Sequence, residues 1–420
     1  MSGPVANNVF RSSGVVASAA GGLSWQDVVT ASTVTVEAGN GYPINTTSNT
    51  CTITLPSSAE AGDQIIFLDY ARTWGTNKII IDSNGLNYQG EDDTYTVEYD
   101  TDGQTVSIVY SGATVGWIPE SDVDVTDAPV APNTQKAIFG YGFVDGNPGV
   151  SMTNLVSSSG VVATDVTGVG TARYAPAASG YGLDKAIFGY GYTGSQVSIT
   201  NLVNNSGVVA TDTTGVGTVR SYLTATRYGT DKAIFAYGFT GSNVSMSNLV
   251  NSSGVVATDT SGVGTTRHAL AAAGYGGDKA IFGFGNSGSR VSLTNLVSNS
   301  GVVATDTTGV GTARDYLAAA NYGTDKAIFG YGHNPGKVSM TNLVSNVGVV
   351  SSDVSGVGTA RSGLAASGYG GDKAIFAYGT TGSVSSLSNL VSSSGVVAAD
   401  VTGVGTAREL LAAAGYSITA

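Results

Sequence analysis

The sequence has few of the residues that build most catalytic sites. Of its 420 residues, one is cysteine and two are histidine, at positions 268 and 333. A single cysteine excludes an intrachain disulfide. A Ser-His-Asp triad would have to use His268 or His333, and neither has a partner motif. We therefore expect no catalytic residues and no cofactor.

Charged residues are also scarce, at 11% of the chain, against about a quarter in an average protein. Residues 1–128 hold three bases and sixteen acids, a net charge of −13, so the remainder carries +1 of the total of −12. There is no basic footprint for nucleic acid, no apolar run long enough for membrane insertion and no signal-peptide pattern near Met1. The 60 glycines and many β-branched residues indicate an all-β protein, extracellular or viral.

Closely spaced carboxylates could suggest calcium. Asp100 to Gly103 and Asp122 to Asp124 contain such groups, but neither segment has the spacing of an EF-hand loop. Turn chemistry explains the first segment and a solvated linker the second. We expect no metal.

The first part of the chain divides into three segments. Residues 1–31 are rich in Gly, Ser, Ala and Asn, and we interpret them as an attachment segment. Seven short strand candidates lie between residues 32 and 120, with Asp102-Gly103 as a hairpin signal between the last long ones. They predict a small β-sandwich or jelly roll that anchors the protein and oligomerises. Residues 121–135, with Pro129, Pro132 and several acids, are a linker.

The rest of the chain contains six copies of one sequence motif. Lys185 to Gly191 reads Lys-Ala-Ile-Phe-Gly-Tyr-Gly, and close copies begin at five other lysines. The repeat step is 47 residues in the Arg series and in the Asp series. The arginines are Arg173, Arg220, Arg267, Arg314, Arg361 and Arg408, and the aspartates are Asp165, Asp212, Asp259, Asp306, Asp353 and Asp400. Such regularity indicates a repeat architecture.

Four strands fit in each unit: a small Ala-rich strand after the Arg, the Lys-Ala-Ile-Phe strand, a strand with Asn-Leu-Val, and a Gly-Val-Val strand. An innermost strand of small residues suits wedge-shaped blades that converge on an axis. Residues 136–420 therefore predict a six-bladed β-propeller. The region begins without an Ala-rich strand and ends with one, at 409–416, so the C-terminal strand should complete the first blade.

The residues of this repeat resemble those of a known repeat family. The order of Arg, small strand and Lys-Ala-Ile-Phe-Gly-Tyr-Gly resembles the kelch repeat, although the kelch Trp is absent. The chain also looks like virion fibre proteins of marine bacteriophages, in the sequence of its repeats, in the segment from Ile53 to Ser58 and in Gly116-Trp117. The resemblance implies a phage virion surface protein and specifies no ligand.

The repeated charges have a structural interpretation. The Arg and Asp series and the Asp-Lys pairs, such as Asp184-Lys185, should bridge strands or blades, because a site for one ligand would not need six copies. Thr164 to Gly168 faintly resembles the Asp-box of sialidase propellers, but its Asp and Gly are three apart and the aromatic is missing. We therefore do not expect sialidase-like activity.

Positions that differ among the copies are the candidate binding site. They lie in the loops after the Lys-Ala-Ile-Phe strand and directly after each Arg, and alternating strand directions place both on one face. Surface loops vary freely in sequence. This variation alone does not explain why aromatic and amide side chains are concentrated at these positions. The candidates are Phe143, Asn147, Tyr174, Tyr192, Gln196, Tyr222, Phe239, Asn243, His268, Asp315, Tyr316 and Asn334.

The expected function is a non-enzymatic fibre or receptor-binding protein on the virion surface. Residues 32–120 would bind other virion proteins and form a homotrimer, and the propeller would bind a host-surface glycan or protein. Two alternatives stay open: a capsid decoration or head-fibre protein, and a propeller enzyme that acts on polysaccharide.

Overall fold

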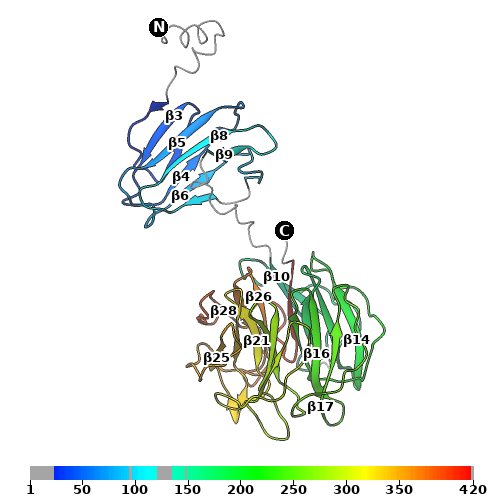
Figure 1. Cartoon of the computed structure of the whole chain (residues 1–420). Helices are drawn as coiled ribbons and strands as arrows, with labels where there is room; N and C mark the ends of the chain where they lie inside the picture. Colours follow the sequence, from blue (N-terminus) through cyan, green and yellow to red (C-terminus); the bar gives the residue numbers. More distant parts are fainter. Residues whose placement is uncertain (1–22, 94–96, 121–134, 147–148, 418–420) are drawn as a thin grey trace, which may run out of the picture. The chain divides into compact units, whose positions relative to one another are not determined.

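The computed structural model describes residues 23–93, 97–120, 135–146 and 149–417. The chain divides into two compact units, unit 1 (residues 1–132) and unit 2 (residues 133–420), seen in Figure 1. Every secondary-structure element assigned in the described residues is a β-strand, so the predicted all-β class is confirmed.

Unit 1 is a sandwich of two sheets with the strand orders β1-β3-β5-β8-β9 and β2-β4-β6-β7. Alternating side chains from both sheets meet in one core, in which Phe67, Trp74 and Trp117 are fully buried. The first sheet consists of β1 (Ser24–Trp25), β3 (Asn40–Ile44), β5 (Gln64–Asp69), β8 (Thr105–Tyr110) and β9 (Trp117–Pro119), and the second of β2 (Thr33–Thr35), β4 (Cys51–Thr54), β6 (Ile79–Asp82) and β7 (Val97–Tyr99).

From β1 to β6 the chain of unit 1 alternates between the two sheets. As a result β1, β3 and β5 pair in parallel, as do β2, β4 and β6, and only the later pairs are antiparallel. The sequence predicted either a β-sandwich or a jelly roll. Because jelly rolls are antiparallel, the structure confirms the sandwich. The hairpin predicted at Asp102-Gly103 is wrong, because β7 pairs with β6 while β8 pairs with β5. That turn carries the chain from one sheet to the other.

Unit 2 is a ring of six blades, each with an inner, a middle and an outer antiparallel strand (Figure 1). Blade one consists of β29 (Ala412–Tyr416), β10 (Lys136–Gly140) and β11 (Thr153–Val156); blade two of β12 (Ala177–Tyr181), β13 (Lys185–Tyr192) and β14 (Gln196–Val203); blade three of β15 (Thr224–Tyr228), β16 (Lys232–Phe239) and β17 (Asn243–Val250); blade four of β18 (Ala271–Tyr275), β19 (Lys279–Gly283) and β20 (Thr294–Val297); blade five of β21 (Ala318–Tyr322), β22 (Lys326–Gly330) and β25 (Thr341–Val344); and blade six of β26 (Ala365–Tyr369), β27 (Lys373–Ala377) and β28 (Ser388–Val391).

The C-terminal strand closes the ring. β29 pairs with β10 in an antiparallel register that sets Phe139 opposite Ala413. The inner strands of neighbouring blades lie side by side all the way round, including β26 beside β29 and β29 beside β12. The predicted six-bladed propeller with a C-terminal closing strand is therefore confirmed.

The prediction of a fourth regular strand in each blade is wrong. The Gly-Val-Val segment of blade one touches the outer strand only at two isolated bridges, Val156 to Val162 and Thr153 to Val166. The side chain of Asn154 explains the interruption, because its Nδ2 donates to the carbonyl of Ala163 at 2.9 Å, where a regular ladder would use a backbone donor.

A buried arginine joins each pair of blades. Arg173, between blades one and two, is fully buried and donates from Nη2 to Oδ1 of Asn201 at 2.7 Å. Its guanidinium carbon lies 4.0 Å from the ring centroid of Tyr141 in blade one. Nη1 lies 4.0 Å from Oδ1 of Asp212, whose carboxylate accepts hydrogen bonds from the backbone N–H and hydroxyl of Thr171. These contacts connect the two blades.

All six junctions have this construction, with an Arg over an aromatic ring, an Asn and an Asp. The last one joins Arg408 to Asn154 and Asp165 across the closure of the ring. The predicted bridging role of the Arg and Asp series is confirmed. It is wrong for the Asp-Lys pairs, because Lys185 Nζ bonds Oδ1 of adjacent Asp184 at 2.8 Å within one partly exposed turn.

Candidate functional site

The two faces of the ring carry different connections. The loops between middle and outer strands, and the segments that join blades, lie on one face, which we call the loop face. The turns between inner and middle strands, and those after the outer strands, lie on the opposite face, the turn face. Gln135 and Ser417, the first and last described residues of unit 2, are on the turn face, because β10 begins there and β29 ends there.

A closed ring of backbone hydrogen bonds surrounds the axis on the loop face. Each member is the second residue after a junction arginine, and its N–H donates to the carbonyl of its equivalent in the preceding blade at 2.7–3.1 Å. All six have a positive φ, between 50° and 63°. Such a conformation costs energy in residues other than glycine, and the hydrogen bonds offset it. The members are Ala175, Tyr222, Ala269, Tyr316, Gly363 and Leu410.

Two of these ring members are aromatic and start a larger cluster. The ring centroid of Tyr222 lies 5.9 Å from that of Tyr316, 6.5 Å from Tyr174 and 6.0 Å from His268, all in edge-on contacts. These distances are typical of favourable aromatic pairs. All four side chains are half-buried, so each keeps part of its ring accessible.

The cluster continues into the loops of the first three blades. Tyr174 lies 5.3 Å from Tyr192 and 5.7 Å from Phe143, and Phe239 lies 5.6 Å from His268. We call these seven residues the aromatic cluster: Phe143, Tyr174, Tyr192, Tyr222, Phe239, His268 and Tyr316. All were predicted as binding residues, and the structure brings them together in one continuous set of ring contacts.

A polar network borders the cluster at blades four and five. Asp315, only 2% exposed, accepts hydrogen bonds from Nε of Arg290 at 3.1 Å and from Nδ2 of Asn286 at 2.9 Å. Nη2 of Arg290 lies 2.6 Å from Nδ1 of His333. Because a guanidinium can only donate, His333 accepts through Nδ1 and holds its proton on Nε2.

The network is linked to the aromatic cluster through Asn243. Its Oδ1 lies 2.7 Å from Nδ1 of His268, and its Nδ2 donates to the carbonyl of Asn286 at 3.1 Å. Since Nδ2 donates, the amide oxygen is free to accept, and His268 donates from Nδ1. Aromatic and polar groups therefore form one connected surface.

The remaining candidates are less central. Gln196 pairs through its backbone with Tyr192 in a blade-two hairpin. Asn334 belongs to β23 (His333–Asn334), which pairs with β24 (Gly336–Lys337) at the edge of blade five. Asn147 lies outside the described residues. The candidates predicted from the sequence do not include Asn286, Arg290, His333 and Glu409, although all four occupy the variable positions from which the other candidates come.

Burial favours the uncharged forms of Tyr222, His268 and Glu409. It raises the pKa of Tyr222, with further contributions from nearby Tyr316, Tyr174 and Glu409. It lowers the pKa of His268, although the charge of Asp315 opposes this. It also raises the pKa of Glu409. Tyr222 therefore stays protonated and His268 stays neutral near pH 7, so their rings present neutral stacking surfaces.

No protein-family model and no curated protein matches this chain. The part of the chain that the structure describes has no helix of the length and hydrophobicity that a membrane span needs. In the same residues, His, Cys, Asp and Glu side chains form no group of three or more that could hold a metal ion.

Proposed function

We propose that this chain is a non-enzymatic surface protein of a phage virion, a fibre or receptor-binding protein, and that the loop face of its propeller binds a host-surface glycan or protein. The virion assignment rests on the resemblance of the repeats to phage fibre proteins. The binding assignment rests on the loop face.

One observation carries the binding assignment. Residues that differ from blade to blade gather into one half-buried aromatic cluster bordered by amides and an ion pair. Aromatic rings suit the apolar faces of sugars, and amides and carboxylates suit their hydroxyl groups. The described residues of unit 2 begin and end on the turn face, so neither end lies among the loops of the loop face.

Unit 1 would attach the propeller to other virion proteins and form a homotrimer. Its described residues expose Trp25 (55%) and Tyr70 (58%), large aromatic side chains that could be covered on assembly. Light scattering of the full chain should give three times the mass of one chain. A monomer at micromolar concentration would contradict the trimer.

The test of the proposed function has two parts. Antibody labelling of phage particles should find the protein at the tail or fibre tip, and the full chain should bind an array of bacterial surface polysaccharides. Each site should be weak, since millimolar affinity is worth only about −4 kcal/mol, with avidity supplied by several copies. Labelling of the capsid alone, without array binding, would instead support the head-decoration alternative.

One feature favours the enzymatic alternative. Glu409 on the loop face has a raised pKa, mainly through burial, which is a property of catalytic acids. Release of oligosaccharides from a bound polysaccharide, abolished by Glu409→Gln, would establish that alternative. Binding without release by the unaltered protein supports the proposal.

A further inference from the structure

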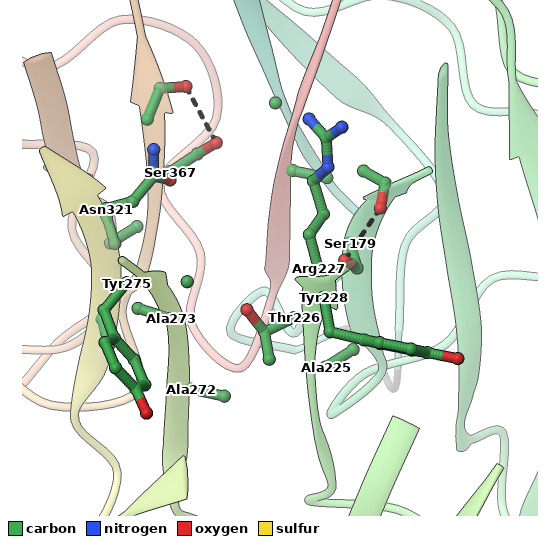
Figure 2. A pocket seen from close by; sticks show the side chains of 18 of the residues that line it. Ser179, Ala225, Thr226, Arg227, Tyr228, Ala272, Ala273, Tyr275, Asn321 and Ser367 are labelled. Carbon is green, nitrogen blue, oxygen red and sulfur yellow. Dashed lines mark hydrogen bonds between the residues drawn. The ribbon is translucent and has the colours of Figure 1, made fainter. Parts of the chain in front are cut away.

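A cavity of about 350 Å³ lies on the propeller axis toward the turn face, walled by the inner strands (Figure 2). It extends from the six alanines at the second position of these strands to the inner-middle turns, where Leu183 is 44% exposed. A separate cavity of about 120 Å³ lies on the loop-face side of the same alanines. The larger cavity has the size of a small-molecule site, for which roughly 300–1,000 Å³ is usual.

Arg227 breaks the repeat inside this cavity. The fourth residue of the inner strand is glycine in blades one, two, four and six, asparagine in blade five and arginine in blade three. The stem of Arg227 extends over Gly180 of blade two, where a Cβ would lie 3.0 Å from its Cδ. The glycine in the neighbouring blade therefore provides the space that the arginine occupies.

Most N–H groups of the Arg227 guanidinium have no hydrogen-bond partner among the described residues. Nη2 of Arg227 donates to the carbonyl of Thr230, and a guanidinium has five N–H groups. Four remain in a geometry that suits a carboxylate or phosphate. The positive charge is partly screened from water, since burial lowers the pKa of Arg227, against the effect of nearby Asp231.

Other polar groups surround the same space. Asn321, two blades from Arg227, lies on the other side of the cavity in Figure 2, with its amide against Gly368. Ser179 and Ser367 donate their hydroxyl protons to the carbonyls of Gly180 and Gly368, at 3.1 and 3.2 Å. Their oxygens can still accept hydrogen bonds, while the alanines supply apolar walls.

The charge of the turn face favours an anion. The described residues of this face include six lysines and Arg227 against five aspartates, a net charge of +2, because Gln135 replaces the aspartate before Lys136. The turns after the outer strands contain no charged residue. The loop face has the opposite sign, with Asp145, Asp315 and Glu409 against Arg290 and Lys337. Negative solutes are therefore drawn toward the cavity.

We infer that the axial cavity binds a small molecule with a carboxylate or phosphate group. The guanidinium of Arg227 pairs with the oxyanion, Asn321 hydrogen-bonds the polar part of the ligand, and the alanine walls contact its apolar part. This site is separate from the loop face and does not depend on the function proposed for that face.

Equilibrium dialysis of the full chain against labelled acetate and inorganic phosphate, at constant ionic strength, tests this inference. The unaltered protein should bind at least one of them saturably, and the one bound tighter identifies the oxyanion. Arg227→Gly installs the residue of four other blades, so it should fold, and it should weaken binding by about tenfold or more. Arg227→Asn, the residue of blade five, is a second variant with the same expectation.

Lys337→Gln, on the loop face, is the control and should bind the probes as the unaltered chain does. Side-chain spectra add a second readout, since the Nε–H signal that Arg227→Gly removes should shift during the titration. Absence of saturable binding to the unaltered chain would overturn the inference. So would equal binding by folded Arg227→Gly and Arg227→Asn.

Discussion

Two adjacent positions of the repeat behave in opposite ways. The junction arginine is the same in all six copies and fully buried in each, with a carboxylate, an amide and an aromatic ring around it. The next residue is Tyr, Ser, His, Asp, Ser or Glu, and it lies on the loop face, half-buried where it is Tyr, His or Glu and buried where it is Ser or Asp. Invariance within the repeat therefore marks the contacts that join blades, and variation marks the surface available for binding.

The largest expected effect comes from breaking the ring itself. Removing residues 409–420 deletes the buried Leu411 and β29, in which Ala412, Ala414 and Tyr416 are buried, and exposes the edge of β10. At about 25 cal/mol per Å² of apolar area, the loss is several kcal/mol. We expect a much lower melting temperature and aggregation of unit 2 in calorimetry and light scattering. Removal of residues 418–420 alone is the control, and equal melting of both truncations would contradict the closing role of β29.

The next effect tests one junction. Arg267 is fully buried, donates to Oδ1 of Asn295 at 2.5 Å and to the carbonyl of Thr265 at 3.1 Å, and lies 4.4 Å from the ring centroid of Tyr237. Arg267→Met keeps the apolar bulk but leaves these acceptors unpaired. We expect a loss of about 2–4 kcal/mol in the free energy of unfolding, measured with denaturant.

Lys279→Met in the neighbouring blade is the matched control. Its ion pair with Asp278 spans 3.2 Å, and the side chains are 47% and 32% exposed. Exposed pairs contribute little, so this variant should unfold almost as the unaltered protein does. A similar loss in both variants would mean that the junction arginines have no special role.

Acid should weaken the junctions. Burial alone would raise the pKa of Asp306, but hydrogen bonds from Thr265 and Asn295, with the charge of Arg267, hold it below its usual 3.8. Because the folded-state pKa is below the unfolded one, this stabilisation is complete above about pH 4 and is lost as the pH falls further. Denaturant unfolding from pH 3 to 7 should show the decline, with a shallower slope for Asp306→Asn. An unchanged slope would contradict this contribution.

The sequence predicted the features that repetition makes visible. The 47-residue step, the small inner strands and the orphan strand at 409–416 were sufficient for the ring, its closure and the face where Tyr174, Tyr192 and Phe239 meet. Parallel pairing in unit 1 was not predictable, because alternation along a strand does not tell which strand lies beside it.

Other features depend on individual side-chain contacts or on the closed ring. The Asn154 side chain interrupts the fourth strand through a bond that no local pattern reveals. The hydrogen-bonded ring through Tyr222 and Tyr316 requires all six blades to be in place. Arg227 could have been noticed, because it stands where four other repeats have glycine, but the cavity around it exists only in the closed ring.

The most direct test of the account changes each face separately and measures attachment and melting together. Tyr192→Ala with Phe239→Ala removes two half-buried rings of the aromatic cluster. Asn204→Ser with Asn251→Ser changes the turn face but keeps its turns, because Ser157 accepts the equivalent backbone bond in blade one. We predict that the first pair abolishes binding to host cells or surface polysaccharide without changing the melting temperature, and that the second pair leaves both unchanged. Attachment that survives the first pair, or is lost only with the second, would contradict binding by the loop face.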